Sequence, residues 1–197
     1  MLTLPAKLTN VMKLVRRPWV WFLRFRQRRG YGVHSPFAYA FIRDVLLQTW
    51  PYYAYEELDR LHPWAERHVT TYPRNCRRML FRMANAVHPG TMSVLGERAT
   101  ERAYMSAAVP KARWVEGGVA DLVLVAHERL SEVPELINHL PPRATLICEG
   151  ISESKADRAI WNEVKAHART TITFDLYTYG IALLDRPLTP ADYIVCF

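Results

Sequence analysis

Residues 91–103, TMSVLGERATERA, decide the fold of this chain. A short β-rich run over 92–95 ends at Gly96, and a polar turn then leads into a predicted helix over 99–109. This strand–turn–helix pattern is typical of a nucleotide- or cofactor-binding α/β domain, in which the turn and the helix N-terminus meet the ligand. Such a turn normally holds several glycines, but only Gly96 is present. The pattern therefore predicts the scaffold of a cofactor site with an incomplete cofactor loop.

Downstream of this stretch, short apolar runs alternate with helical stretches. The runs predicted as strands cover 92–95, 112–115, 122–125 and 145–148. The helices predicted between and after them cover 99–109, 130–139 and 154–168. This alternation indicates a parallel sheet with crossover helices. The chain ends differently, because no helix separates the last predicted strands, 171–176, 179–184 and 193–197. We therefore expect the sheet to finish with an antiparallel edge.

Upstream of the sheet, residues 30–90 read as a helical region. Ser35 followed by Pro36 predicts a helix start, with Ser35 as the N-cap and His34 fixing the approach to the helix by hydrogen bonding. Two further helices are predicted over 52–61 and 74–87. The second has an apolar face and an arginine face, and we expect the arginines to point into solvent: Arg74, Arg77, Arg78 and Arg82. Residues 88–90, His-Pro-Gly, predict the boundary to the α/β domain 91–197.

The first 29 residues form a basic arm. The whole chain has a formal net charge of +7, and residues 1–30 hold eight basic residues and no acid. The rest of the chain therefore has a net charge of −1, the difference between +7 and +8. Apolar residues recur at helical spacing over 6–29, with an interruption at Pro18. Six arginines of this amphipathic arm are the candidate anion-binding residues: Arg16, Arg17, Arg24, Arg26, Arg28 and Arg29.

Three partners for the arm remain open on the sequence alone. Its apolar stripe, which includes Trp19, can pack against its own domain or against a second subunit in a homodimer. Interleaved aromatic and basic residues also suit an anionic membrane surface. The same residues suit nucleic acid, where phosphates contact the arginines and bases stack on the aromatic rings.

Cysteine spacing and hydropathy indicate the cellular compartment of the protein. The three cysteines, Cys76, Cys148 and Cys196, are widely spaced and form no CxxC pair. This pattern favours free thiols in a reducing compartment over a disulfide framework or a zinc site. No run of about 18 apolar residues without charges occurs, so no transmembrane helix is predicted. We expect a cytoplasmic protein, with peripheral membrane binding through residues 1–29 as one alternative.

Three segments carry a resemblance to a known family. The first is Gly-Tyr-Gly-Val-His-Ser-Pro-Phe at 30–37, the second is the aromatic segment at 52–58, and the third is Thr-Phe-Asp-Leu-Tyr-Thr-Tyr-Gly-Ile at 173–181. Together with the expected sheet they resemble class I S-adenosylmethionine-dependent methyltransferases. Within that class, the chain is similar to a bacterial group that has an N-terminal G-x-G-[VI]-H-S-P-F element. The likeness covers most of residues 29–197.

The resemblance implies roles for four positions. Gly96 would belong to the loop that wraps the methionine part of S-adenosylmethionine, and Glu116 would bind the ribose hydroxyls. Ala126 stands where the family usually has an aspartate, and Glu149 stands where a pair of acids is usual. In metal-dependent members these later acids bind a divalent cation. One carboxylate is too few, so no metal is expected.

The chain also departs from the family in length. Only residues 117–120 separate Glu116 from the next predicted strand, whereas a crossover connection needs a dozen or more residues. In the family's numbering we therefore expect a sheet of order 2-1-4-5-7-6, without the family's third strand. The broken loop, the lost acids and the deletion favour a degenerate, non-catalytic descendant that binds a partner. The alternatives are an active S-adenosylmethionine-dependent methyltransferase, and a membrane- or nucleic-acid-associated module that uses the arm.

Overall fold

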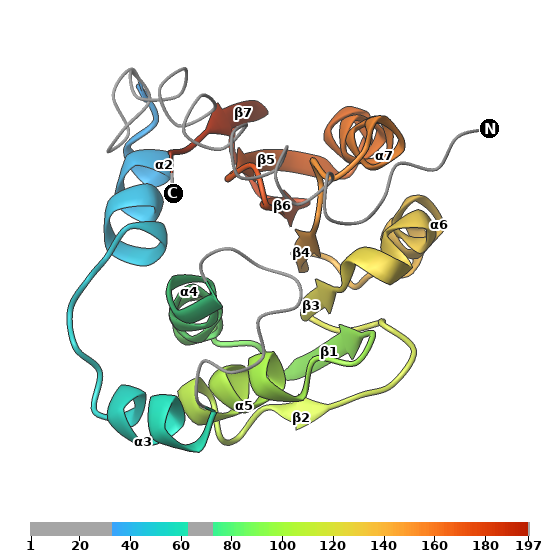
Figure 1. The fold of residues 1–197 in the computed structure, drawn as a ribbon. Coiled ribbons are helices and arrows are strands. Elements are labelled where there is room, and N and C mark those ends of the chain that lie inside the picture. Colours follow the sequence, from blue (N-terminus) through green and yellow to red (C-terminus); the bar gives the residue numbers. More distant parts are fainter. Residues whose placement is uncertain (1–32, 63–72, 197) are drawn as a thin grey trace, which may run out of the picture.

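The computed structural model describes residues 33–62 and 73–196 (Figure 1). The predicted arm helix over 6–29 lies outside the described residues, and so do its six candidate anion-binding arginines. What the sequence predicts for the arm therefore stays a prediction.

The described residues form one seven-stranded sheet of order β2-β1-β3-β4-β6-β5-β7. The central strands are short apolar runs, as expected for strands that are covered on both faces. In chain order the strands are β1 Thr91–Leu95, β2 Arg113–Trp114, β3 Leu122–Val125, β4 Thr145–Glu149, β5 Thr170–Asp175, β6 Tyr179–Leu184 and β7 Ala191–Ile194.

The strand order confirms one part of the prediction and corrects another. From β2 to β5 the order is that of the class I methyltransferase sheet without its third strand. The expected order of six strands is wrong, because it leaves out the strand predicted over 193–197. The structure has a strand there, β7, which pairs with β5 as a seventh strand. The antiparallel pairing expected among the C-terminal strands is confirmed for β5 and β6, but the edge strand β7 does not share it. Only β6 runs antiparallel to its neighbours β4 and β5, whereas β7 is parallel to β5.

The link between β2 and β3 explains the missing strand. Gly117 and Gly118 have positive φ angles of 76° and 82°, and the chain passes from them directly to β3. A side chain at Gly118 would meet Leu95 and Leu136, each with a side-chain carbon 3.0 Å from the Cβ position. The turn is therefore tight and is packed against the sheet. No strand lies between Glu116 and Asp121, so β2 forms the edge of the described sheet.

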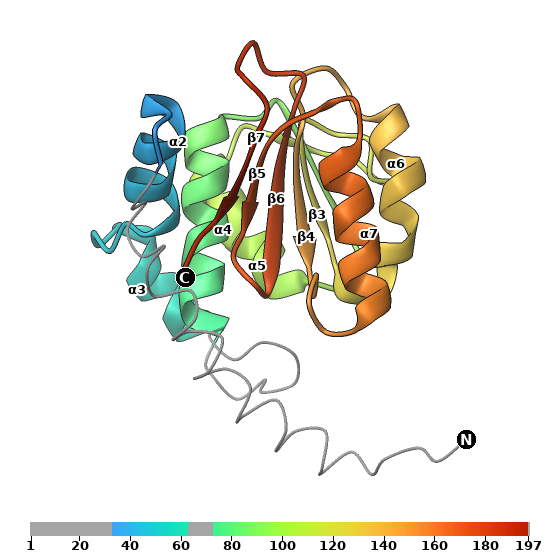
Figure 2. The same cartoon turned by 90° about the horizontal axis from the view of Figure 1, so that it is seen from above.

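Helices cover both faces of the sheet (Figures 1 and 2). Helices α2, α4 and α5 lie on one face, with α3 outside α5, and α6 and α7 lie on the other. The bounds are α2 Pro36–Phe41, the π-helical turn η2 Ile42–Leu46, α3 Ala54–Leu61, α4 Pro73–Val87, α5 Ala99–Ala108, the 3-10 turn η3 His127–Glu132, α6 Val133–His139 and α7 Lys155–Ala166.

Each face of the sheet has its own apolar core. On one face, Met79 and Met83 of α4 pack with the buried side chains of the strands, among them Phe174. On the other face, Ile137 of α6 and Trp161 of α7 do the same. Residues of α2, η2 and α4 belong to the first core, so these elements of the helical region 30–90 pack directly on the sheet, whereas α3 packs in a separate cluster with side chains of α4 and α5.

Helix α2 starts where the sequence predicts, but His34 does not have the role that we expected. The Ala38 N–H donates to Ser35 Oγ at 3.3 Å, so Ser35 is the N-cap and Pro36 occupies the first turn. His34 is exposed and forms no hydrogen bond with the described residues, so the expectation that it fixes the approach to the helix was wrong. Ser154 caps α7 in the same way as Ser35, accepting from the Asp157 N–H at 3.1 Å.

The arginine face of α4 is a further correction. Arg77 and Arg82 are 7% and 6% exposed, although both were expected in solvent. Arg82 donates through Nε to the Val45 carbonyl at 2.6 Å and through Nη2 to the Leu46 carbonyl at 2.8 Å. These carbonyls lie at the end of η2, where helical carbonyl groups lack partners within the helix. Arg82 therefore closes a helix end instead of contacting water.

Within residues 33–62 and 73–196, none of the helices has the length and apolar character that crossing a membrane requires.

Candidate functional site

The candidate site lies at the carboxyl ends of β1, β3 and β4, which meet at one edge because the three strands are parallel. Gly96 follows β1, Ala126 follows β3, and Glu149 is the last residue of β4. The structure thus brings together three of the four positions that the resemblance singled out. Glu116 follows β2, the next parallel strand, and lies at the same edge of the sheet.

Arg98 dominates this edge. Its Nε donates to Glu149 Oε2 at 2.8 Å. Its Nη1 and Nη2 donate to the two carboxylate oxygens of Glu128 at 3.0 and 2.8 Å, and Nη1 also donates to the Glu97 carbonyl at 2.9 Å. One guanidinium therefore joins a carboxylate at the end of β4 to a carboxylate of η3. We call Arg98, Glu128 and Glu149 the Arg98 cluster.

The two carboxylates of the Arg98 cluster differ in their surroundings. The side chain of Glu149 is 4% exposed, and that of Glu128 is 50% exposed. Burial raises the pKa of Glu149 above its usual value, and the ion pair with Arg98 reverses only part of this effect. Burial also acts to raise the pKa of Glu128, but a backbone hydrogen bond and Arg98 together hold it below its usual value. Glu149 is therefore the carboxylate that depends most on Arg98.

A second hydrogen bond reaches Glu149 from the last part of the sheet. The Tyr179 hydroxyl donates to Glu149 Oε1 at 3.4 Å, and both side chains are buried. Tyr179 begins β6, which pairs with β4 so that Glu149 and Tyr179 lie opposite each other. Burial raises the pKa of Tyr179 well above its usual value, so the hydroxyl keeps its proton and can serve as a donor. Arg98 and Tyr179 thus each donate to one oxygen of Glu149.

The Gly96 turn has no free space above it. Gly96 has a φ of +108°, and a Cβ placed on it would lie 2.5 Å from Ala126 Cβ and 2.8 Å from Glu128 Oε1. The turn after β1 therefore packs directly against the loop after β3. This contact also explains why the position after β3 holds a small alanine, which is fully buried. A family aspartate at this position would compete with the Gly96 backbone for the same space.

Glu116 stands apart from the Arg98 cluster. It is exposed and forms no hydrogen bond or ion pair with the described residues. Nearby on the β2 edge, the Arg102 guanidinium lies 4.4 Å from the centroid of the Trp114 ring, and Trp114 Nε1 donates to Ser106 Oγ at 3.0 Å. The family's third strand, which would extend this edge, is missing. Glu116 is therefore the one family-like cofactor residue whose carboxylate is available to a ligand.

The residues present do not fit S-adenosylmethionine as the family binds it. Glu128 and Arg98 fill the place beside the Gly96 turn, and the sheet lacks the strand that would support the adenine side. Within the described ranges, no three His, Cys, Asp or Glu side chains are grouped so that they could hold a metal ion. That the protein binds no metal stays a prediction.

Sequence reasoning missed the pairing of Arg98 with Glu149 and Glu128. Along the chain, Arg98 only interrupts the expected glycine loop, and Glu149 is only the remainder of an acid pair. A signal was present, because one basic and two acidic residues follow three strands that were each predicted correctly. The carboxyl ends of neighbouring parallel strands share one edge, so opposite charges in those loops are placed to pair.

No family model matches the sequence, and no curated protein matches it. Solved structures do show similarity to the chain. The O-methyltransferase TomG from Streptomyces achromogenes, involved in tomaymycin synthesis and solved with SAM, has 11% identity and a TM-score of 0.47, with 71% of this chain and 93% of that chain covered. Cofactor-bound Rv0187 from MTB has 13% identity and a TM-score of 0.39, with 68% and 88% covered.

A third similar structure is the O-methyltransferase from Bacillus cereus in complex with SAH. It has 9% identity and a TM-score of 0.41, with 73% of this chain and 95% of that chain covered. Similarity at this level identifies no activity for this chain. The site must therefore be interpreted from its own geometry.

Proposed function

We propose that this protein is a non-catalytic descendant of the methyltransferase fold that acts by binding a partner. The observation that carries the proposal is the Arg98 cluster. Its guanidinium joins Glu128 and Glu149 at the place where the resemblance puts the methionine part of the cofactor. Such a chain would be a degenerate member of the bacterial group with the G-x-G-[VI]-H-S-P-F element.

The energetic argument rests on the buried carboxylate. A ligand beside the Gly96 turn would displace Glu128 and draw Arg98 away, which would leave Glu149 buried without its counter-ion. Removing one partner of a buried ion pair costs about 3–5 kcal/mol. Since about 1.4 kcal/mol corresponds to a factor of ten, this cost would weaken a micromolar ligand to about the millimolar range.

Calorimetric titration of the full chain with S-adenosylmethionine and S-adenosylhomocysteine tests the proposal. We expect no binding tighter than about 1 mM for either compound, because the free energy of displacing the cluster offsets most of what the ligand gains. Circular dichroism of the same sample controls for folding. Micromolar binding of either compound would contradict the proposal.

The second candidate is an active methyltransferase, and the exposed carboxylate of Glu116 favours it. If the titration detects binding, the Glu116→Ala variant measures how much of the affinity comes from the Glu116 carboxylate. A carboxylate that accepts from two ribose hydroxyls contributes about 1.5–3 kcal/mol, so its loss would weaken binding by roughly 10- to 150-fold. An unchanged affinity would mean that the ligand does not use the position that the resemblance assigns to the ribose.

For residues 1–29 we propose contact with an anionic surface, on the basis of charge segregation. Eight basic residues and no acid precede Gly30, while the rest of the chain has a net charge of −1. A variant with glutamine at the six candidate arginines should bind phosphatidylserine vesicles and single-stranded RNA at least about 10-fold more weakly at low salt. Moderate salt should weaken the unmodified chain as well, because screening shortens to about 8 Å.

The two probes distinguish the source of the anionic charge, and the arm can be tested separately as an interface. Sedimentation of a chain that lacks residues 1–29 measures whether the arm holds a homodimer together. If the glutamine variant keeps its affinity for both probes and the truncated chain keeps its assembly state, the arm is neither an anionic contact nor an interface.

A further inference from the structure

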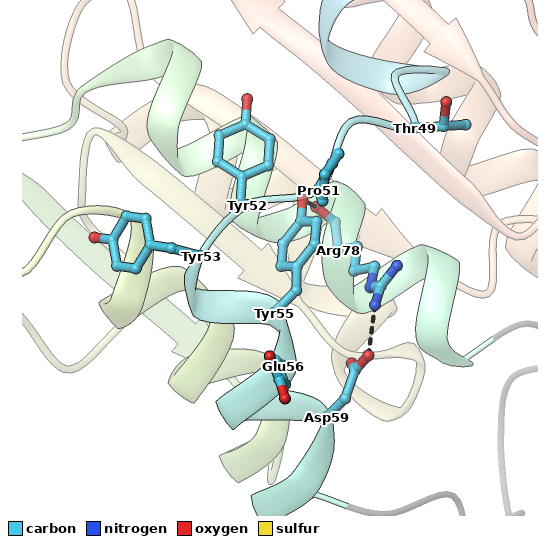
Figure 3. Close-up of a pocket in the computed structure, with 8 residues that line it drawn as sticks. All are labelled: Thr49, Pro51, Tyr52, Tyr53, Tyr55, Glu56, Asp59 and Arg78. Atoms are coloured by element: carbon cyan, nitrogen blue, oxygen red, sulfur yellow. Dashed lines mark hydrogen bonds and ion pairs between the residues drawn. The ribbon is translucent and has the colours of Figure 1, made fainter.

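A pocket of about 560 Å³ lies on the outer side of the helical layer, away from the sheet edge described above (Figure 3). The segment that leads into α3, the first turns of α3 and one side chain of α4 form its lining. None of its lining residues belongs to the Arg98 cluster. The pocket therefore stands independently of the proposed function.

Aromatic rings form the wall of the pocket. Tyr52, Tyr55 and Phe81 pack against one another with ring centroids 5.0–5.3 Å apart, which holds two of the three tyrosines of the lining in place. The Arg78 guanidinium lies 4.6 Å from the centroid of the Tyr55 ring. This wall thus already holds one cation against an aromatic face, which is the geometry of a cation–π interaction.

The two carboxylates of the pocket differ in their partners. Arg78 Nη2 donates to Asp59 Oδ2 at 2.6 Å, and the Tyr104 hydroxyl donates to Asp59 Oδ1 at 2.5 Å, so Asp59 has its counter-ion. Glu56, one turn earlier on α3, is exposed and forms no ion pair with the described residues. Glu56 is therefore the carboxylate of the lining that has no ion pair among the described residues.

The mouth of the pocket adds exposed aromatic surface. Tyr53, which lines the pocket, is 89% exposed, and Trp50, which lies in the sequence between two lining residues, is 73% exposed. Large aromatic side chains that are this exposed are common at sites that bind a partner, since water contact with their rings is unfavourable. Next to an unpaired carboxylate, these rings favour ligands that combine an apolar stem with positive charge.

We infer that this pocket binds an organic cation, an ammonium or guanidinium group on an apolar stem. Glu56 pairs with the positive group, and the rings of Tyr52 and Tyr53 contact the stem. A neutral ligand of the same shape can donate hydrogen bonds to Glu56 but forms no ion pair with it. The cation can come from a free small molecule or from a lysine or arginine side chain of a polypeptide, and both present the same chemistry.

Nuclear magnetic resonance titration of the full chain with n-butylguanidinium tests the inference. The matched control ligand is n-butylurea, which has nearly the same shape and no charge. We expect n-butylguanidinium to shift signals of the pocket residues with a Kd of about 1–10 mM. We expect n-butylurea to bind at least about 5-fold more weakly, because it has no positive charge to pair with Glu56 or to contact the aromatic faces.

Two glutamine variants on the same helix isolate the carboxylate. Glu56→Gln removes the unpaired charge from the pocket, whereas Glu57→Gln removes a neighbouring exposed charge outside the lining. We expect Glu56→Gln to weaken n-butylguanidinium by about 5- to 10-fold and Glu57→Gln by less than about 2-fold. Equal effects of the two variants, equal binding of n-butylurea, or no pocket shifts at about 50 mM ligand would overturn the inference.

Two blocked tripeptides identify the source of the cation. One is acetyl-Gly-Arg-Gly-amide, and the other has the neutral isostere citrulline in place of arginine. Tighter binding of the arginine peptide than of n-butylguanidinium supports a polypeptide ligand, and weaker binding supports a free small cation. If the citrulline peptide binds as tightly as the arginine peptide, the pocket does not select a cation and the inference fails.

Discussion

The Arg98→Met variant should lose about 3–5 kcal/mol of its free energy of unfolding, because Glu149 would remain buried without its counter-ion. Arg98 Nε lies 2.8 Å from Glu149 Oε2, and the Glu149 side chain is 4% exposed. Methionine keeps much of the length and apolar contact of the arginine stem, so the loss reports mainly on the charge. Urea unfolding followed by circular dichroism measures it.

Two further variants make the result specific to the buried ion pair. Glu128→Gln removes the half-exposed partner of Arg98 and should cost no more than about 1 kcal/mol, as exposed pairs do. The double variant Arg98→Met with Glu149→Leu should recover most of the lost stability, because an apolar pair leaves no charge buried. A cost for Arg98→Met as small as that for Glu128→Gln would contradict the description of Glu149 as dependent on Arg98.

The strand order was predictable because each central strand is an apolar run bounded by turn residues. The link 117–120 also excluded a crossover by its length alone. The pairing of β7 was not predictable. Its burial alternates between half-buried and exposed residues, a pattern typical of an edge strand that does not specify the neighbouring strand. Its register with β5, in which Tyr193 lies opposite Phe174, becomes visible only in the folded sheet.

The buried arginines of α4 show that a charged side chain on a helix does not always point into solvent. Arg82 looks like part of a solvated helix face, yet its guanidinium donates to two carbonyls at the end of η2. Those carbonyls need donors because the π-helical turn stops there, and the sequence gives no sign that it stops beside α4. The candidate site likewise depends on contacts that the sequence does not reveal. Gly96 and Glu116 were located by strand ends, but the Arg98 cluster required knowing which loops meet.

The Gly180→Ala variant should lose about 3 kcal/mol of its free energy of unfolding, because the added methyl group overlaps the ring of Trp161. A Cβ on Gly180 would lie 2.7 Å from Cη2 and Cζ3 of that ring. Trp161 is fully buried in the core between α7 and the sheet. Gly180 lies within β6, between Cys148 of β4 and Asp175 of β5, so the backbone is held from both sides. Neither the ring nor the strand has space to move.

A variant at a second glycine serves as a control, because it measures the cost of losing glycine's backbone freedom without a steric overlap. Gly117 has a φ of +76° with no atom within 4 Å of its Cβ position, so Gly117→Ala should cost about 1–2 kcal/mol, from the backbone alone. For a chain of this size about 3 kcal/mol lowers the melting temperature by roughly 6–12 °C, which calorimetry resolves easily. If the melting temperature of Gly180→Ala is no lower than that of Gly117→Ala, contact with Trp161 does not explain the glycine at position 180.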